Sequence, residues 1–424
     1  MSAGTTDKTV VTRRETTRNT LRLMAAGIAS QAAAILLTPA VARIYAPEDV
    51  GALGIVLSLV GIVVTLSTAR YEQAIIIERS IVRARALFKL CLVLCIATSI
   101  VVAIAERIIG GRTIARWLNT PAMADYTWLI APLVLLSGIG YTATYAFNRQ
   151  GQFNYSARYI ATQGVVGNAL KVAFGFLPGG LYYANVGGHI IGLLTVVRRL
   201  PLRHIRWSTL REQIRIVAAE HWRFPTFNLP HALISTIAGN MPLMILAFAY
   251  GGSEVGCFAM CMTIGYKPVG VFAQSVGMSL FHSASRNREA HVDYARPLRR
   301  FALRTVVVVA AVSVALYVCM PWLTLLFFGD GWDDTCAIMR CLLPLFAMSA
   351  VSIPLNFVPS MLNQQGRAML IETCSAVVRT AAIAYGSAAG DIAFATLLLA
   401  LTHSAFFAGQ VIWYFSLMRR DGVQ

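Results

Sequence analysis

Charged residues are scarce in this sequence. Only 13% of the 424 residues are Asp, Glu, Lys or Arg, whereas soluble domains average about 25%. Hydrophobic residues make up 57%, and the mean hydropathy is +0.63. Long apolar stretches recur from residue 21 to residue 418. This pattern excludes a water-soluble fold and predicts a bundle of membrane-spanning helices.

Catalytic and nucleotide-binding motifs are also missing. The sequence has no GxxxxGK[ST] phosphate loop, no HExxH pair and no nucleophile elbow. The longest predicted outer loop, about 108–126, is too short for a soluble catalytic domain. The pairs Cys91/Cys95 and Cys257/Cys261 lie in apolar segments, and we interpret them as packing residues rather than metal ligands. We therefore expect no enzyme, cofactor or metal.

About twelve spans are predicted, which makes the fold an all-α polytopic membrane protein. We expect them at about 22–44, 52–70, 87–107, 127–147, 158–177, 181–200, 229–250, 255–281, 301–327, 336–361, 368–389 and 392–417. Prolines lie within or beside several of them, as is common where helices are broken to line a cavity. No cleavable signal peptide is visible, because the polar N-terminal arm precedes a long apolar stretch without a clear cleavage site.

The net charge of +17 is distributed unevenly along the chain. With the spans above, 28 of the 36 basic residues fall on the side of the two termini and 4 fall on the opposite side. Basic loops are retained in the cytoplasm, so both termini are predicted to be cytoplasmic. The membrane topology accounts for the positive charge, and we do not expect nucleic acid as a partner.

Two short stretches recur between the halves of the chain. Residues 45–51 (YAPEDVG) are similar to 250–256 (YGGSEVG), and 148–152 (NRQGQ) are similar to 363–367 (NQQGR). The nearly equal offsets predict two six-helix lobes of the same orientation. The predicted domains are a cytoplasmic arm at 1–21, an N-lobe at 22–200, a basic linker at 201–228, a C-lobe at 229–418 and a cytoplasmic tail at 419–424.

Four basic residues fall within predicted spans, whereas no Asp or Glu falls deep within one. They are Lys171, Lys267, Arg340 and Arg379. A charge in the bilayer is costly and usually faces the bundle interior or an aqueous cavity. Phosphate suits such a cavity, since Arg binds it bidentately and Lys as a point charge. The alternative is that each cation pairs with carbonyls or reaches a lipid headgroup. We favour an electropositive, anion-binding cavity.

Uncharged polar side chains also lie within the spans, and some are candidates to contact sugar hydroxyls. These candidates are Gln31, Asn168, Asn240, Gln274 and Asn356. Interhelical hydrogen bonding is the simpler explanation for any one of them. His403 is a candidate for proton coupling, with a structural role as the alternative.

Arg70, Tyr71 and Glu72 close the second span on the predicted cytoplasmic side. Arg and Tyr commonly anchor helices at a membrane interface. We regard these three residues as candidates for a cytoplasmic gate.

Several stretches together carry a family resemblance. They are 37–51 (LTPAVARIYAPEDVG), 69–75 (ARYEQAI), 223–230 (RFPTFNLP), 254–256 (EVG), Pro268 and 328–332 (FGDGW). In these the chain resembles the Wzx-type polysaccharide-repeat-unit flippases. These flippases are part of the polysaccharide transporter family of the multidrug/oligosaccharidyl-lipid/polysaccharide exporter superfamily.

The resemblance implies two six-helix lobes around a central cavity with basic residues, of which Lys267 and Arg379 correspond best. It implies alternating access that moves an undecaprenyl-diphosphate-linked oligosaccharide across the bacterial inner membrane, for lipopolysaccharide or exopolysaccharide biosynthesis. We expect coupling to H+ or Na+, as in an antiporter. The expected partners are the lipid-linked glycan, membrane lipid, and the polymerase and chain-length proteins of the same pathway.

Three other functions stay open on the sequence alone. A multidrug exporter of the same superfamily would favour embedded carboxylates, which are not evident. A membrane-embedded glycan polymerase or ligase would need a larger outward-facing surface. A lipid scaffold without transport is the third alternative.

Overall fold

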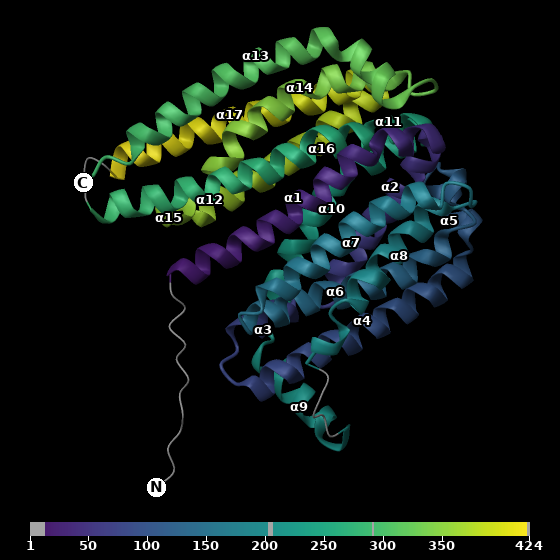
Figure 1. The fold of residues 1–424 in the computed structure, drawn as a ribbon, viewed down its shortest axis with the longest axis vertical. Coiled ribbons are helices and arrows are strands. Elements are labelled where there is room, and N and C mark those ends of the chain that lie inside the picture. The colour runs from purple at the N-terminus through teal and green to yellow at the C-terminus, as the bar shows by residue number, and fades with distance from the viewer. Residues whose placement is uncertain (1–12, 202–206, 291, 422–424) are drawn as a thin grey trace.

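Two helical lobes form the molecule (Figure 1). The computed structural model describes residues 13–201, 207–290 and 292–421. The N-lobe contains α1 (Arg13–Ile44), α2 (Pro47–Ser67), α3 (Tyr71–Ile77), α4 (Ile81–Ile109), α5 (Gly111–Trp117), α6 (Ile130–Arg149), α7 (Phe153–Ala173) and α8 (Gly180–Leu194). The connecting helix is α9 (Trp207–Glu220). The C-lobe contains α10 (Leu229–Tyr250), α11 (Gly252–Cys261), α12 (Lys267–Glu289), α13 (Ala295–Phe328), α14 (Asp334–Ser352), α15 (Val358–Met361), α16 (Gln365–Ala389) and α17 (Ile392–Asp421).

The all-helical membrane fold is confirmed. Within the described ranges, 10 helical segments are long and apolar enough to cross a membrane. The two further spans expected at 158–177 and 181–200 correspond to α7 and α8. The α8 helix has only 15 residues, and α7 contains two basic residues, Arg158 and Lys171. Both helices nevertheless pack among the spans of the N-lobe, α7 against α1 and α8 against α7 and α6.

The packing order repeats between the lobes. In the N-lobe, α1, which is the first expected span, packs on α7, which is the fifth. In the C-lobe the corresponding spans, α10 and α16, pack in the same way. The pairs α4–α6 and α7–α8 have the counterparts α13–α14 and α16–α17. The repeated stretches occupy equivalent places, since 45–51 and 250–256 lead into α2 and α11, while 148–152 and 363–367 lead into α7 and α16. The short similarities therefore mark equivalent turns of two lobes.

The lobes meet most closely where α2 crosses α11. A Cβ added to Gly256 would lie 1.8 Å from the carbonyl oxygen of Pro47, and one added to Gly51 would lie 2.3 Å from that of Gly252. No side chain fits between these backbones, so the repeated glycines are required by the close approach. Buried side chains of both lobes, such as Ile55 and Val255, form one apolar cluster around this crossing.

Polar contacts close the same end of the molecule. The Trp332 indole donates to the carbonyl of Ala42 (2.9 Å), and the Arg43 guanidinium donates to that of Leu326 (2.9 Å). Towards the opposite end the lobes diverge, and α3 and α9 lie well away from α15 and the end of α17 (Figure 1). The molecule is thus closed at the α2–α11 end and open at the other.

Gly256→Ala should destabilise the protein by about 1–3 kcal/mol, because the added methyl group overlaps the Pro47 carbonyl. Gly270→Ala is the matched control, since a Cβ there meets nothing within 4 Å. It should be neutral or slightly stabilising, as alanine is the better helix former. Thermal unfolding of the detergent-solubilised protein measures both, and equal midpoints for the two variants would contradict this account of the crossing.

Candidate functional site: a cationic cavity between the lobes

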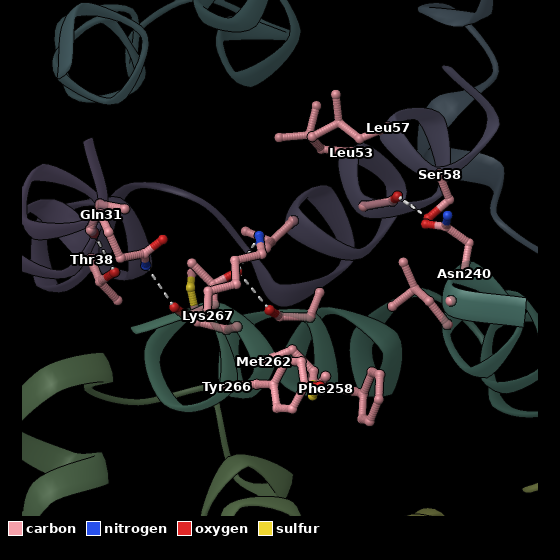
Figure 2. A pocket seen from close by; sticks show the side chains of 18 of the residues that line it. Gln31, Thr38, Leu53, Leu57, Ser58, Asn240, Phe258, Met262, Tyr266 and Lys267 are labelled. Carbon is pink, nitrogen blue, oxygen red and sulfur yellow. Dashed lines mark hydrogen bonds between the residues drawn. The ribbon is translucent and has the colours of Figure 1, made fainter. Parts of the chain in front are cut away.

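A cavity of about 590 Å3 lies between the lobes. Its walls come from α1, α2, α7 and α8 on one side and from α10, α11, α12, α16 and α17 on the other. Figure 2 shows Gln31 of α1 and Lys267 of α12 on one side of the pocket, with Ser58 of α2 near Asn240 of α10. A volume of this size is typical of small-ligand sites, which range from about 300 to 1,000 Å3.

Three of the four basic residues singled out by the sequence line this cavity: Lys171, Lys267 and Arg379. The Lys171 ammonium donates to Oδ1 of Asn168 (3.0 Å), and that of Lys267 donates to the Thr263 hydroxyl (3.3 Å). Among the residues that the structure describes, neither lysine forms a salt bridge. Both lysine ammonium groups, one from each lobe, are therefore available to an anion in the cavity.

Lys267 is positioned by a break in its span. Residues Met262–Tyr266 form a π-helical turn between α11 and α12, and Pro268 follows. In a π turn the N–H of residue i bonds to the carbonyl of residue i−5, so Pro268, which has no N–H, leaves the Thr263 carbonyl without that donor. The side-chain amide of Gln31 donates to this carbonyl instead (3.0 Å). Gln31 thereby joins α1 of the N-lobe to the break in the C-lobe.

Arg379 and His403 form a contact on the C-lobe side. An N–H of the Arg379 guanidinium donates to Nε2 of His403 over 2.7 Å. Arginine offers no acceptor, so Nε2 must be unprotonated while this bond exists. His403 therefore orients the guanidinium as a neutral ring, and its predicted part in proton coupling stays a prediction.

The candidate sugar-contacting residues are divided between two environments. Gln31, Asn168 and Asn240 line the cavity, although each also donates to a backbone carbonyl. Gln274 is exposed on α12 outside the cavity lining, and Asn356 accepts a hydrogen bond from the Tyr414 hydroxyl (3.2 Å).

Arg340 lies outside the cavity as well. Its guanidinium donates to the Tyr317 carbonyl (3.0 Å) and lies 4.7 Å from the centre of the Tyr317 ring. Arg340 thus pairs α14 with α13, which is the alternative that the sequence left open for an isolated cation. We do not include it in the anion site.

One expectation about the spans requires correction, because an acid does lie within one. Glu372 is about two turns into α16, inside the span Gln365–Ala389, and its carboxylate lies 3.4 Å from the Arg379 guanidinium. The expected span began at 368, which placed Glu372 near the membrane edge, but the helix begins at Gln365. Arg379 is therefore partly neutralised, while Lys171 and Lys267 are not.

The candidate gate residues lie outside the cavity, at the open end of the N-lobe. Ala69 and Arg70 both adopt positive φ (49° and 63°), which is uncommon for residues other than glycine. The Glu72 side chain is 0% exposed and lies 3.4 Å from the Arg70 guanidinium. Burial raises the pKa of Glu72, and the nearby Arg70 charge offsets this only in part. A role for this strained turn as a gate stays a prediction.

Residues of α3, of the α3–α4 junction and of the first turn of α4 hold α9 against the N-lobe. The Tyr71 hydroxyl donates to the Ala218 carbonyl (3.2 Å), and Arg83 binds both oxygens of Glu220 (2.8 and 2.9 Å). His221 lies 3.1 Å from the Glu78 carboxylate. Partial burial raises the pKa of Glu78, but hydrogen bonds from the Ser80 N–H and His221, with the charges of His221 and Arg83, outweigh it, so the net pKa is lowered.

Glu78→Gln should loosen α9, since the lowered pKa means that docking favours the charged carboxylate. For an acid with a lowered folded pKa, the stabilisation is present above its unfolded pKa of about 4.3 and is lost as the pH falls through the folded value. The protection of amide hydrogens across 207–221, relative to their intrinsic exchange rates at the same pH, should therefore fall in the variant at pH 7, and in the unmodified protein only on acidification below about pH 4. Glu212→Gln, at an exposed position of α9, is the control. Unchanged protection in the Glu78 variant would refute the proposed role of the Glu78–His221 contact in holding α9.

Comparison with solved structures identifies the fold. The lipid II flippase MurJ in an inward closed conformation is 13% identical, with a TM-score of 0.67, and the match covers 96% of this chain and 90% of that one. An inward-facing multidrug resistance MATE family transporter of the MOP superfamily is 12% identical with a TM-score of 0.64, covering 95% and 96%. The MATE multidrug transporter DinF-BH is 15% identical with a TM-score of 0.60, covering 96% of each chain. The chain therefore has the same two-lobed helical fold as these structures.

The family follows from the sequence itself. Residues 40–337 match the family described as polysaccharide biosynthesis protein, and the chain belongs to that family. No curated protein matches the chain significantly.

Proposed function

We propose that this protein flips undecaprenyl-diphosphate-linked oligosaccharide units across the bacterial inner membrane. The supporting observation is that Lys171, Lys267 and Arg379, from three different helices, line one cavity between the lobes. The family supplies the pathway, polysaccharide biosynthesis. MurJ, which has the same fold, is named as a lipid II flippase.

The diphosphate is the group that the cavity suits best. Lys171 of the N-lobe and Lys267 of the C-lobe approach it from opposite sides, and Arg379 completes the set. Hydrogen bonds between ionised groups are the strong ones, and their strength increases away from bulk water. The amides of Asn168, Asn240 and Gln31 would then face the first sugars, while the prenyl chain stays in lipid.

Movement would follow from the contacts between the lobes. The crossing of α2 and α11 closes one end, which we assign to the outer face of the membrane because both termini are predicted to be cytoplasmic. Lobes at 22–200 and 229–418 would rock about this crossing, with 201–228 as the cytoplasmic linker between them, so the open state described here faces the cytoplasm. Coupling to an H+ or Na+ gradient would supply the energy, and the polymerase and chain-length proteins would take up the product.

A multidrug exporter is the weaker candidate. The charged residues that line the cavity are basic, and Glu372, which contacts one of them, is paired with Arg379. A cationic drug would be repelled by Lys171 and Lys267. The same strains described below can be tested for resistance to organic cations, which should not change.

Lys267→Gln and Arg379→Gln should each reduce flipping by about tenfold or more, since each removes one charged hydrogen-bond donor to the diphosphate. Deletion of the gene should leave the lipid-linked glycan on the inner leaflet, measured by its protection from a membrane-impermeant reagent. The two variants should fail to restore its transfer in that strain.

Arg340→Gln is the matched control, because it removes a membrane-embedded cation outside the cavity. It should restore flipping fully at equal protein levels in the membrane. Full activity of both cavity variants, or an equal loss in the control, would overturn the proposed anion site.

A further inference from the structure

Polar side chains in the C-lobe form two layers between α16 and α17. Glu372 and Arg379 are seven residues apart on α16, and His403 and Gln410 are seven apart on α17. Seven residues are close to two helical turns, so each pair lies on one face. The helices pack side by side (Figure 1), and Arg379 contacts His403 while Glu372 contacts Gln410.

Glu372 connects the two layers. Its Oε1 lies 3.4 Å from the Arg379 guanidinium, and its Oε2 accepts from the Gln410 amide over 3.4 Å. Gln410 is held in turn by the Ser352 hydroxyl (3.3 Å). Of the three cations that line the cavity, Glu372 therefore contacts Arg379.

The carboxylate, rather than the arginine, is the partner that can be displaced. The Glu372 side chain is 58% exposed and both of its contacts are long. The Arg379 side chain is 15% exposed and is fixed by His403, which is itself 7% exposed. Charge-assisted hydrogen bonds are usually shorter than 3 Å, so contacts of 3.4 Å hold the carboxylate weakly and an incoming anion can replace it.

We propose that Glu372 is an internal competitor for Arg379 and selects multiply charged phosphate groups over singly charged ones. The proposal rests on the proposed function, since it assumes that anions bind at Arg379. A phosphodiester headgroup has about one negative charge and would merely exchange with the carboxylate. A diphosphate has one charge on each phosphorus, so it engages Arg379 and still has a charge left for Lys171 and Lys267.

The chemistry explains why such a competitor is useful. Membrane phospholipids present phosphodiesters in large excess over any lipid-linked diphosphate. An open cavity with three unpaired cations would fill with these headgroups. With Glu372 beside Arg379, a single charge gains little at Arg379 and can use only the two lysines, whereas a diphosphate reaches the lysines and Arg379 together. Glu372 is a specificity-determining residue that acts through Arg379.

Binding of two soluble probes tests this proposal. The full-length protein in phosphatidylcholine nanodiscs is titrated with P1,P2-dimethyl diphosphate, which has one charge on each phosphorus, and with dimethyl phosphate, by calorimetry at low salt. Glu372→Gln should bind dimethyl phosphate about threefold to fivefold more tightly than the unmodified protein. Its affinity for diphosphate should change less, so the selectivity ratio should fall. Glu289→Gln, an exposed acid at the end of α12, controls for the loss of one negative charge and should leave the ratio unchanged.

A double-mutant cycle shows whether Glu372 acts through Arg379. In an Arg379→Gln background, adding Glu372→Gln should have no further effect on the selectivity ratio. If Glu372→Gln changes the ratio equally in both backgrounds, the effect is a general one and the proposal fails.

The failures of the two proposals differ. If Arg379→Gln leaves diphosphate binding unchanged, the anion site itself is wrong. If Arg379→Gln weakens diphosphate binding but the selectivity ratio of the Glu372→Gln variant equals that of the unmodified protein, the anion site stands and only the proposed role of Glu372 is wrong. Because Glu372 is largely exposed, its replacement by Gln should preserve the fold, and the unfolding temperature of the variant checks this.

Discussion

The architecture depends on one backbone contact, the crossing of α2 over α11 at Gly51 and Gly256. Because these glycines allow the helices to touch through their main chains, the lobes are held together at one end without bulky side chains between them. The polar contacts of Trp332 and Arg43 support the same end. A pair of rigid lobes joined at one end must diverge at the other, and the cavity lies where they begin to separate.

The cavity in turn explains how cations are retained in an apolar chain. A lysine facing lipid would lose its hydration without compensation. Lys171 and Lys267 instead point into a space that both lobes enclose, and each has a hydrogen-bond partner on its own helix or the adjacent turn. The π turn at Met262–Tyr266 brings Lys267 to this space, and Gln31 satisfies the carbonyl that Pro268 leaves free. A break that would weaken an isolated helix is here stabilised by the opposite lobe.

The sequence was sufficient to predict the fold class and to single out three basic residues that line the cavity. Hydropathy and the basic loops identify a multispanning bundle, and the repeat at 45–51 and 250–256 identifies two lobes, since each reflects a physical requirement that is local in sequence. Helical position alone does not say which face of a helix a residue occupies in the bundle. Arg340 and Lys267 are both embedded cations, yet one pairs with Tyr317 and the other lines the cavity. Glu372 was missed because its distance from the membrane edge depends on where α16 begins, and residues 365–368 are too polar to mark that point.

The charges of the cavity and of its proposed substrate can be compared directly. Lys171, Lys267 and Arg379 with Glu372 amount formally to a charge of +2, which matches a diphosphate with one charge on each phosphorus. An uncompensated set of three cations would exceed that charge, and the substrate would leave such a site slowly. A transporter must bind its cargo and also release it, so a carboxylate that can return to Arg379 favours release as much as selection. In the proposed transport cycle, the same weak contact, 3.4 Å between Glu372 and Arg379, would serve both binding and release.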